Sequence, residues 1–329
     1  METIIETCRV GDVEITVETG KVAKQANSVV ITVGETVVLV TAVSSPDPKD
    51  LPFLPLTVEY RETGSAAGKI PGGYFKREGR PSEAEILTCR VTDRPIRPLF
   101  PKGYRNDTQI ISTVLSHDKE NEPDVLSVTG ASAALTISEI PWQGPIAGIR
   151  VARIDGKFVA FPTFSQQQKA DIVLVVGVSR DAITMVEGGA QQVPESDMID
   201  ALMFAKDAAL PLIELQDRLR ARVGKDKRPF VPPAVDAELI AAVKDFGRAD
   251  MQAAIKIVGK HERHDAIREI KKAALEKFLV SHPEGEEDIK SAIGSLEKDV
   301  VRKQVVQEGV RIDGRDTRTV RPLHIEVHP

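Results

Sequence analysis

The residues best suited to bind a ligand lie in one short segment, GGYFKREGRPSE, at positions 72–83. Two aromatic and three basic side chains share it, namely Tyr74, Phe75, Lys76, Arg77 and Arg80. Proteins that bind single-stranded nucleic acid combine aromatic rings, which stack on bases, with cations that bind the phosphates. The segment admits a second interpretation, in which Phe75 fills the core and the cations belong to a solvated loop.

A second basic segment, DRPIRPLFPKGYR at positions 93–105, places Arg94 and Arg97 among three prolines. Proline restricts the backbone, so guanidinium groups held in such a segment could form a fixed anion-binding array. Alternatively, Asp93 and other nearby acids pair these arginines inside the fold. The residues favour neither interpretation over the other.

Other motifs of catalysis are weak or missing. The run Gly64–Lys69 resembles a phosphate loop, but three residues instead of four separate its glycines and Ile70 replaces the required Ser or Thr. His117 is the only histidine before position 261, and its surroundings, SHDKENEP, are typical of a turn. His261 and His264 have helical spacing, but further zinc ligands at suitable spacing are missing, which favours a solvated helix face.

Charge is distributed unevenly along the chain. Its 329 residues carry a net charge of −5, yet the stretch 60–105 contains ten basic and five acidic residues. Five of the 14 aromatic residues lie in the same stretch. A local basic region on an acidic protein indicates one anionic partner bound at one place, because the whole chain has no general attraction to polyanions.

Composition excludes several classes of protein. No apolar run approaches the length of a membrane span, and the mixed, acidic start METIIETCRV does not resemble a signal peptide. Only Cys8 and Cys89 are present, which argues against a disulfide scaffold or a four-thiolate metal site. We therefore expect a globular protein of the reducing cytoplasm, with no membrane contact.

The sequence predicts that strands precede the basic segments and help to position them. Hairpins are expected at Gly11-Asp12, Gly34-Glu35 and Asp155-Gly156, each flanked by β-branched residues. Residues 61–81 read as a long glycine-rich loop, and loops of this length are usually functional or disordered. Ser82 and Glu85 have the spacing of a capping box, so a helix should begin there and end before Pro95.

The pattern divides the chain into an α/β part and an all-helical part. Pro123 should open a helix of small residues that packs closely against a sheet, and helical periodicity continues from 194 to 223. A linker rich in Pro and charge follows at 224–235, then three helices within 236–308. Residues 309–329 return to strand-like composition, which twenty residues cannot turn into a domain.

The stretch GGYFKREGRPSEAEILTCRVTDRPIRPLFPKGY resembles the N-terminal part of bacterial polynucleotide phosphorylases (polyribonucleotide nucleotidyltransferases). PLTVEYRETGSAAGKIPGG, PDVLSVTGASAAL, DAITMVEGGA and RIDGRDTRTVRPL agree in the same order, so the resemblance covers essentially the whole chain. It implies a first ribonuclease PH-like domain at 1–223, which has an α/β (α+β) fold, and an all-helical domain at 236–308. Residues 309–329 would begin a second ribonuclease PH-like domain.

The resemblance also implies an activity. Members of the family are phosphate-dependent, processive 3′→5′ exoribonucleases of mRNA degradation that release nucleoside diphosphates and assemble as homotrimeric rings in the cytoplasm. They are associated with RNA-degradation complexes that contain an endoribonuclease and a helicase. Their Mg²⁺ and phosphate sites lie in the second ribonuclease PH-like domain, outside this chain. Aligned without gaps, Asp171 falls at the second metal-binding aspartate and Ser165 at the first, so the domain present is expected to lack catalytic and metal-binding residues.

What the resemblance carries over to this chain is RNA binding. In the family an aromatic and basic loop lines the pore of the ring and grips the single strand, and five residues match it: Tyr74, Phe75, Lys76, Arg77 and Arg80. Arg94 and Arg97 match an adjoining segment, with RNA contact and internal pairing both open. Two alternatives stand beside this interpretation. One is a non-catalytic RNA-binding or assembly protein, and the other is a small-molecule enzyme that cradles phosphate in its glycine-rich loop.

Overall fold

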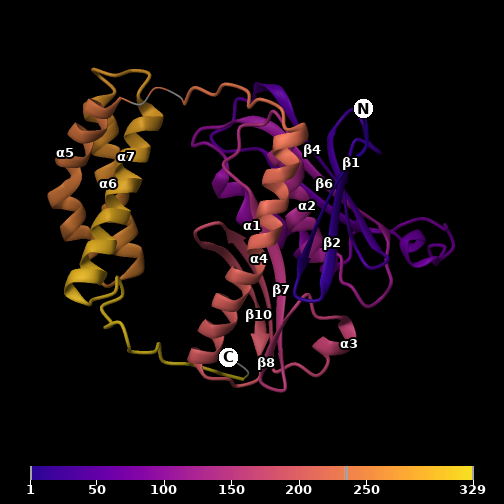
Figure 1. Ribbon diagram of the computed structural model, residues 1–329. Coiled ribbons are helices and arrows are strands. Elements are labelled where there is room, and N and C mark those ends of the chain that lie inside the picture. Colours follow the sequence, from indigo (N-terminus) through magenta and orange to yellow (C-terminus); the bar gives the residue numbers. More distant parts are fainter. Residues whose placement is uncertain (1, 233, 235, 328–329) are drawn as a thin grey trace. The chain divides into compact units, whose positions relative to one another are not determined.

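The computed structural model describes residues 2–232, 234 and 236–327. The chain divides into two compact units, Met1–Pro232 and Pro233–Pro329 (Figure 1). The first unit contains strands and helices, whereas every regular element of the described part of the second unit is helical. The mixed α/β fold class with a following helical region is thereby confirmed.

Two sheets are formed by the described residues of the first unit. The larger has the strand order β1-β2-β3-β4-β6-β5, and the smaller has the order β10-β9-β7-β8. The strands of the larger sheet are β1 (Ile4–Val10), β2 (Val13–Thr19), β3 (Asn27–Val33), β4 (Thr36–Pro48), β5 (Leu56–Glu62) and β6 (Asn106–Ser116). Those of the smaller sheet are β7 (Ile146–Ile154), β8 (Lys157–Ala160), β9 (Ile172–Ser179) and β10 (Ile183–Ala190).

The three hairpins predicted from the sequence are confirmed. Val10 pairs with Val13 across Gly11-Asp12, Val33 with Thr36, and Ile154 with Lys157. Gly11, Gly34 and Gly156 have positive φ angles, which tight turns of this kind require and which glycine adopts without strain.

The glycine-rich segment 63–81 lies on the only parallel connection of the larger sheet, among the described residues. Strand β5 runs parallel to β6, with Leu56 opposite Thr108 and Glu62 opposite Val114. Parallel neighbours need a crossover connection, and this one consists of the segment itself, the short 3₁₀ turn η1 (Gly64–Ala67), helix α1 (Glu83–Ile96) and the turn η2 (Arg97–Leu99). The loop and α1 are therefore fixed to the sheet at both ends of the crossover.

Helices cover both sheets of the first unit. Helix α2 (Asp124–Ile137) contacts β3 and β4 of the larger sheet and β7 of the smaller, and α4 (Glu195–Val223) contacts β1, β7 and β9. The prediction that small residues allow close packing of α2 is confirmed, since a Cβ on Gly130 would lie 2.6 Å from Cγ2 of Val40. The remaining short helix of this unit, α3, spans Phe164–Gln167.

The expected end of α1 before Pro95 is wrong, because the helix continues to Ile96. Proline in the last turn removes one backbone donor, but the helix pattern resumes when Arg97 N–H donates to the Asp93 carbonyl. The Pro95 side chain is buried, and Gly177 of β9 leaves room for it. Tertiary packing thus offsets the lost hydrogen bond.

Part of the segment predicted as a linker is bonded to the first unit. Lys225 N–H donates to the carbonyl of Ile137, and the Lys227 ammonium donates to the carbonyls of Leu135 (2.7 Å) and Ser138 (2.8 Å). These contacts satisfy carbonyls that the end of α2 leaves without helical partners. Positions 233 and 235 of the predicted linker lie outside the described residues.

The second unit is a bundle of helices α5 (Ala237–Ile255), α6 (Lys260–Phe278) and α7 (Glu286–Lys303), extended by the π-helical turn η3 (Gln304–Glu308). Its core holds apolar side chains of all three helices, including Val243, Ile270 and Ile293. Residues 309–327 form a single β-bridge, Val310 with Asp316, and no strand ladder. A strand-like sequence cannot form a sheet without a neighbouring strand. Positions 328–329 lie outside the described residues.

Candidate nucleic-acid interface

Hydrogen bonds close the loop between β5 and α1 at its base. The Arg61 guanidinium donates to the Gly79 carbonyl at 3.0 Å, and Gly64 N–H donates to a Glu78 carboxylate oxygen at 2.8 Å. Each bond joins the beginning of the loop to its end. The residues between them are therefore presented as a defined projection from the crossover.

The first half of the loop is also anchored to the sheet. Ala66 is buried, and its carbonyl accepts a hydrogen bond from the backbone of His117 at 3.0 Å, directly after β6. The turn η1 is closed when Lys69 N–H donates to the Gly64 carbonyl at 2.8 Å. The run that resembles a phosphate loop is thus a short structural turn of the crossover.

The tip of the loop exposes its two aromatic rings. Tyr74 is 93% exposed and Phe75 is 80% exposed. The rings contact each other edge to face, with centroids 5.4 Å apart and planes at 84°. This exposure excludes the interpretation in which Phe75 fills the core. Lys76 follows with a φ of 49°, a strained conformation for a residue with a side chain.

The three cations next to the rings are exposed as well. In the described part of the chain, Lys76, Arg77 and Arg80 form no hydrogen bond or ion pair through their side chains. Cations without internal partners keep their donors available for an external anion. The structure therefore brings all five predicted loop residues together on one projection, with two stacking surfaces and three unpaired charges.

Glu85 fixes the point where the loop ends and α1 begins. One carboxylate oxygen accepts from Ser82 N–H at 2.6 Å and the other from Glu62 N–H at 2.9 Å, while the Ser82 hydroxyl accepts from Glu85 N–H. The predicted capping box is confirmed. Burial tends to raise the pKa of Glu85, but these hydrogen bonds and the nearby Arg61 outweigh burial and lower it. The carboxylate thus holds both ends of the loop while ionised.

Arg97 and Arg94 have different surroundings. The Arg97 guanidinium forms a bidentate pair with Asp93, at 2.6 and 2.9 Å, and donates to the carbonyls of Leu54 and Leu56. The sequence left RNA contact and internal pairing open for Arg97, and the structure shows the internal pairing. Arg94 is more exposed and forms one surface pair with Glu187 of β10, at 2.9 Å.

One further cation on α1 was not singled out from the sequence. Arg90 is exposed, and its side chain has no hydrogen bond or ion pair within the described residues. It precedes Arg94 by one helical turn, so the two side chains lie on the same face of α1. The i, i+4 spacing of two arginines directly after the aromatic and basic loop was the signal available for finding it.

Asp171 and Ser165, which the resemblance was expected to align with metal-binding aspartates, both have partners within the fold. Asp171 accepts two hydrogen bonds from the Arg153 guanidinium, at 2.9 and 2.7 Å, and this pair lowers the pKa of Asp171. The Ser165 hydroxyl donates to Glu120 at 2.7 Å. Among the residues that the structure describes, no group of three or more His, Cys, Asp or Glu has the geometry of a metal site.

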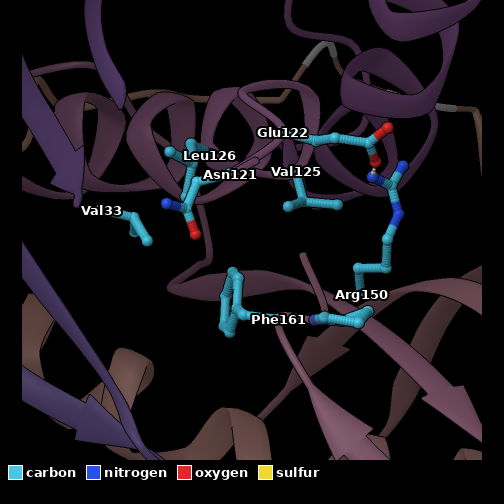
Figure 2. A pocket seen from close by; sticks show the side chains of 8 residues that line it. Val33, Asn121, Glu122, Val125, Leu126, Arg150 and Phe161 are labelled. Carbon is cyan, nitrogen blue, oxygen red and sulfur yellow. Dashed lines mark ion pairs between the residues drawn. The ribbon is translucent and has the colours of Figure 1, made fainter. Parts of the chain in front are cut away.

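A cavity lies between α2 and β7 of the first unit (Figure 2). Its volume of about 10 Å³ has room for about one water molecule. Arg150 extends from β7 beside it and forms ion pairs with Glu122 and with Asp124, the latter at 2.6 Å. The cavity is too small for a substrate, and its charged groups neutralise one another.

Comparison with known proteins agrees with this architecture. The chain matches the 3′ exoribonuclease family, domain 1, at residues 14–141 and domain 2 of the same family at residues 144–208. The boundary between the two matches falls between α2 and β7, where the chain passes from the larger sheet to the smaller. Together the matches span more than half of the chain. The chain belongs to the 3′ exoribonuclease family.

Within this exoribonuclease family, the chain is similar to polyribonucleotide nucleotidyltransferases over nearly its whole length. It is 50% identical to that of Geotalea uraniireducens over 329 residues, which are 99% of this chain and 47% of the relative. It is 51% identical to that of Sorangium cellulosum, over 98% of this chain and 43% of the relative. The chain thus spans about half the length of these curated relatives and corresponds to an N-terminal part of them.

The second unit matches a separate description, the RNA binding domain of polyribonucleotide nucleotidyltransferase, at residues 238–316. This match covers α5, α6, α7 and η3. No helix among the described residues has the length and apolar character required to cross a membrane.

Proposed function

We propose that this chain is the RNA-gripping N-terminal part of a polyribonucleotide nucleotidyltransferase, which degrades RNA processively from its 3′ end with phosphate as co-substrate. The observation that carries the proposal is the loop tip, where two exposed rings adjoin three unpaired cations on a hydrogen-bonded base. Rings provide sequence-tolerant stacking and cations bind the backbone, as a processive enzyme requires. RNA released into bulk solvent after each cleavage would end processivity.

Each loop residue has a distinct role in the proposal. Tyr74 and Phe75 stack on bases, and their perpendicular planes prevent both rings from lying against one face of the same base. Lys76, Arg77 and Arg80 bind phosphates, and Arg90 and Arg94 extend the cationic surface along α1. Arg97 contributes as a positioning residue, since its guanidinium ties the end of α1 to the Leu54 and Leu56 carbonyls at the start of β5.

We place the chemistry outside this chain. Phosphorolysis develops charge on the attacked phosphodiester and needs a metal ion and cationic groups to stabilise it. Asp171, the carboxylate aligned with a family metal ligand, is already paired with Arg153. We therefore assign Mg²⁺ and inorganic phosphate to the second ribonuclease PH-like domain of the whole protein. Assembly as a homotrimeric ring in the cytoplasm, and association with an endoribonuclease and a helicase, belong to the same proposal.

The test incubates the folded chain with poly(A), phosphate and Mg²⁺, and measures ADP release together with RNA binding. We expect RNA binding without ADP release. ADP release would contradict the assignment of catalysis to the second domain, and a lack of RNA binding would contradict the gripping role. The second ribonuclease PH-like domain is then added, either as a separate protein or joined in one chain. ADP release in that mixture supports our proposal, whereas its absence supports the alternative of a non-catalytic RNA-binding protein.

A further inference from the structure

The loop between β5 and α1 starts next to a side chain that is fixed in the core. Tyr60 of β5 is 1% exposed, and its hydroxyl donates to a Glu62 carboxylate oxygen at 2.5 Å. The backbone N–H of Glu62 donates in turn to the carboxylate of Glu85, a residue of α1 that is 8% exposed. The start of the loop is therefore bonded both to the core of the sheet and to the helix that follows the loop.

Glu85 uses both of its carboxylate oxygens in the loop base. One oxygen accepts from Glu62 N–H at 2.9 Å, and the other accepts from Ser82 N–H at 2.6 Å. These two amides lie directly before and directly after the segment 63–81, so one side chain holds the two ends of the loop. An ionised carboxylate accepts at both oxygens, whereas an amide side chain has one oxygen and an NH₂ group that only donates. The two contacts together therefore need a carboxylate.

Arg61 joins the Glu85 carboxylate to the returning strand of the loop. Its Nε lies 3.8 Å from Oε1 of Glu85, and its Nη2 donates to the Gly79 carbonyl at 3.0 Å. A planar guanidinium can make both contacts at once, whereas a lysine ammonium carries the charge without the fork. The Arg61 side chain is 28% exposed. This cation is thus engaged inside the loop base, in contrast to the cations at the loop tip.

Order in the free loop matters for binding. A glycine-rich segment loses much conformational freedom when it becomes ordered. Where that order already exists in the free protein, the ligand does not have to create it, and the affinity is higher. We propose that Glu85 and Arg61 are positioning residues for RNA binding, which pre-organise the loop and do not contact the RNA. This inference rests on the proposed gripping function, and it makes the affinity depend on two side chains at the loop base as well as on those at the tip.

Glu85→Gln tests the two-oxygen contact in the full chain. Glutamine also satisfies a capping box, so α1 should still begin at the same place, whereas Glu62 N–H loses its acceptor. We expect oligo(A) to bind about tenfold more weakly, with a cooperative urea transition retained. Glu6→Gln is the matched control, because Glu6 is another partly buried carboxylate with two donors, Arg218 and Arg222, and lies on β1 at the opposite edge of the sheet. The control should bind RNA like wild type.

Arg61→Lys and Arg61→Met distinguish positioning from a phosphate contact. Both should weaken oligo(A) binding about as much as Glu85→Gln, because neither side chain reproduces the fork. Neither should change the slope of log K against log salt concentration. If Arg61 bound a phosphate, lysine would retain the affinity and methionine would lower the slope by about 0.7, and this result would overturn the positioning role. Arg9→Met is the control, since Arg9 of β1 also donates to a backbone carbonyl, that of Asp12 at 3.3 Å.

Trypsin cleavage after Lys76 and Arg77 measures opening of the loop without RNA. We expect faster cleavage at these two bonds in Glu85→Gln and Arg61→Lys than in wild type. Weaker RNA binding without faster cleavage would overturn pre-organisation as the cause, and an equal loss of affinity in the two controls would overturn the assignment to the loop base. Wild-type affinity in all three test variants would overturn this inference and leave the loop tip as the RNA site. A wild-type chain that does not bind oligo(A) would instead contradict the proposed function itself.

Discussion

Replacing both rings of the loop tip by alanine separates RNA binding from folding. Tyr74 and Phe75 are 93% and 80% exposed, and the centroids of their rings lie 5.4 Å apart. The double variant Tyr74→Ala/Phe75→Ala therefore removes no buried surface. Exposed substitutions of this kind usually change the free energy of unfolding by within about 0.5 kcal/mol, to which the lost ring contact adds up to ~1 kcal/mol.

The expected loss of RNA affinity is larger. Stacking of a base on an aromatic ring contributes ~1–3 kcal/mol. Because the two ring planes stand at 84°, each ring engages its own base face, and two stacking contacts are lost. The variant should bind single-stranded RNA more weakly by ~2–6 kcal/mol, whereas either single variant should lose about half of that.

Fluorescence anisotropy of a labelled oligo(A) measures the affinity, and urea unfolding measures the stability of the same preparations. Phe53→Ala is the matched control, because Phe53 is a phenylalanine that is 61% exposed and lies outside the loop. We expect this control to retain wild-type affinity. Unchanged affinity of the double variant would refute the stacking role. Unfolding of the double variant would show that the rings support the core.

Three further predictions concern the fold around the site. Asp118→Asn should reduce stability at pH 7 by about 1 kcal/mol, because burial raises the pKa of Asp118 but hydrogen bonds from Asn121, Glu120 and Glu35 lower it to about 2, and solvent screens part of this effect at a half-exposed carboxylate. Arg97→Ala should cost ~1–2 kcal/mol of stability through its lost contacts, and Arg94→Ala should leave stability nearly unchanged while weakening RNA binding. Gly130→Ala should destabilise the first unit by ~1–3 kcal/mol, since its Cβ would overlap Val40.

Urea unfolding checks the stability change in each of these predictions, and fluorescence anisotropy checks RNA binding by Arg94→Ala. The folded pKa of Asp118 is lower than its unfolded value, so its contribution is complete above about pH 4 and is lost as the pH falls toward 2. The difference in the free energy of unfolding between Asp118→Asn and wild type should therefore decrease as the pH falls from 4 to 2. A difference that stays constant would contradict the lowered pKa of Asp118. Equal stability of the Arg97 and Arg94 variants, or a Gly130 variant as stable as wild type, would contradict the packing described above.

Local patterns predicted much of the first unit. The three hairpins follow from glycine turns between β-branched runs, and the capping box at Ser82 and Glu85 follows from side-chain spacing. These features depend only on residues that are close together in the sequence, so a local pattern is sufficient to predict them. The end of α1 was missed because it depends on the burial of Pro95 beside Gly177, a contact between distant segments.

The candidate site was predictable in part for the same reason. The aromatic and basic residues of the loop are close together in the sequence, so the sequence predicted their grouping. It did not determine whether their side chains are exposed. The partners of Arg97 include the Leu54 and Leu56 carbonyls, more than forty positions away. In the second unit, the Arg263 guanidinium likewise donates to the carbonyls of Ile257 and Ile312, which are more than fifty positions apart. No periodicity in the sequence indicates either arrangement.

The salt dependence of RNA binding by the triple variant Lys76→Ala/Arg77→Ala/Arg80→Ala tests whether the loop grips RNA through its cations. These cations have no partners among the described residues, so their phosphate contacts should release counterions, at about 0.7 per phosphate on a single strand. We expect weaker binding of oligo(A), with the slope of log K against log salt concentration reduced in magnitude by about 2. Wild-type affinity with an unchanged slope would contradict the claim that this loop grips RNA.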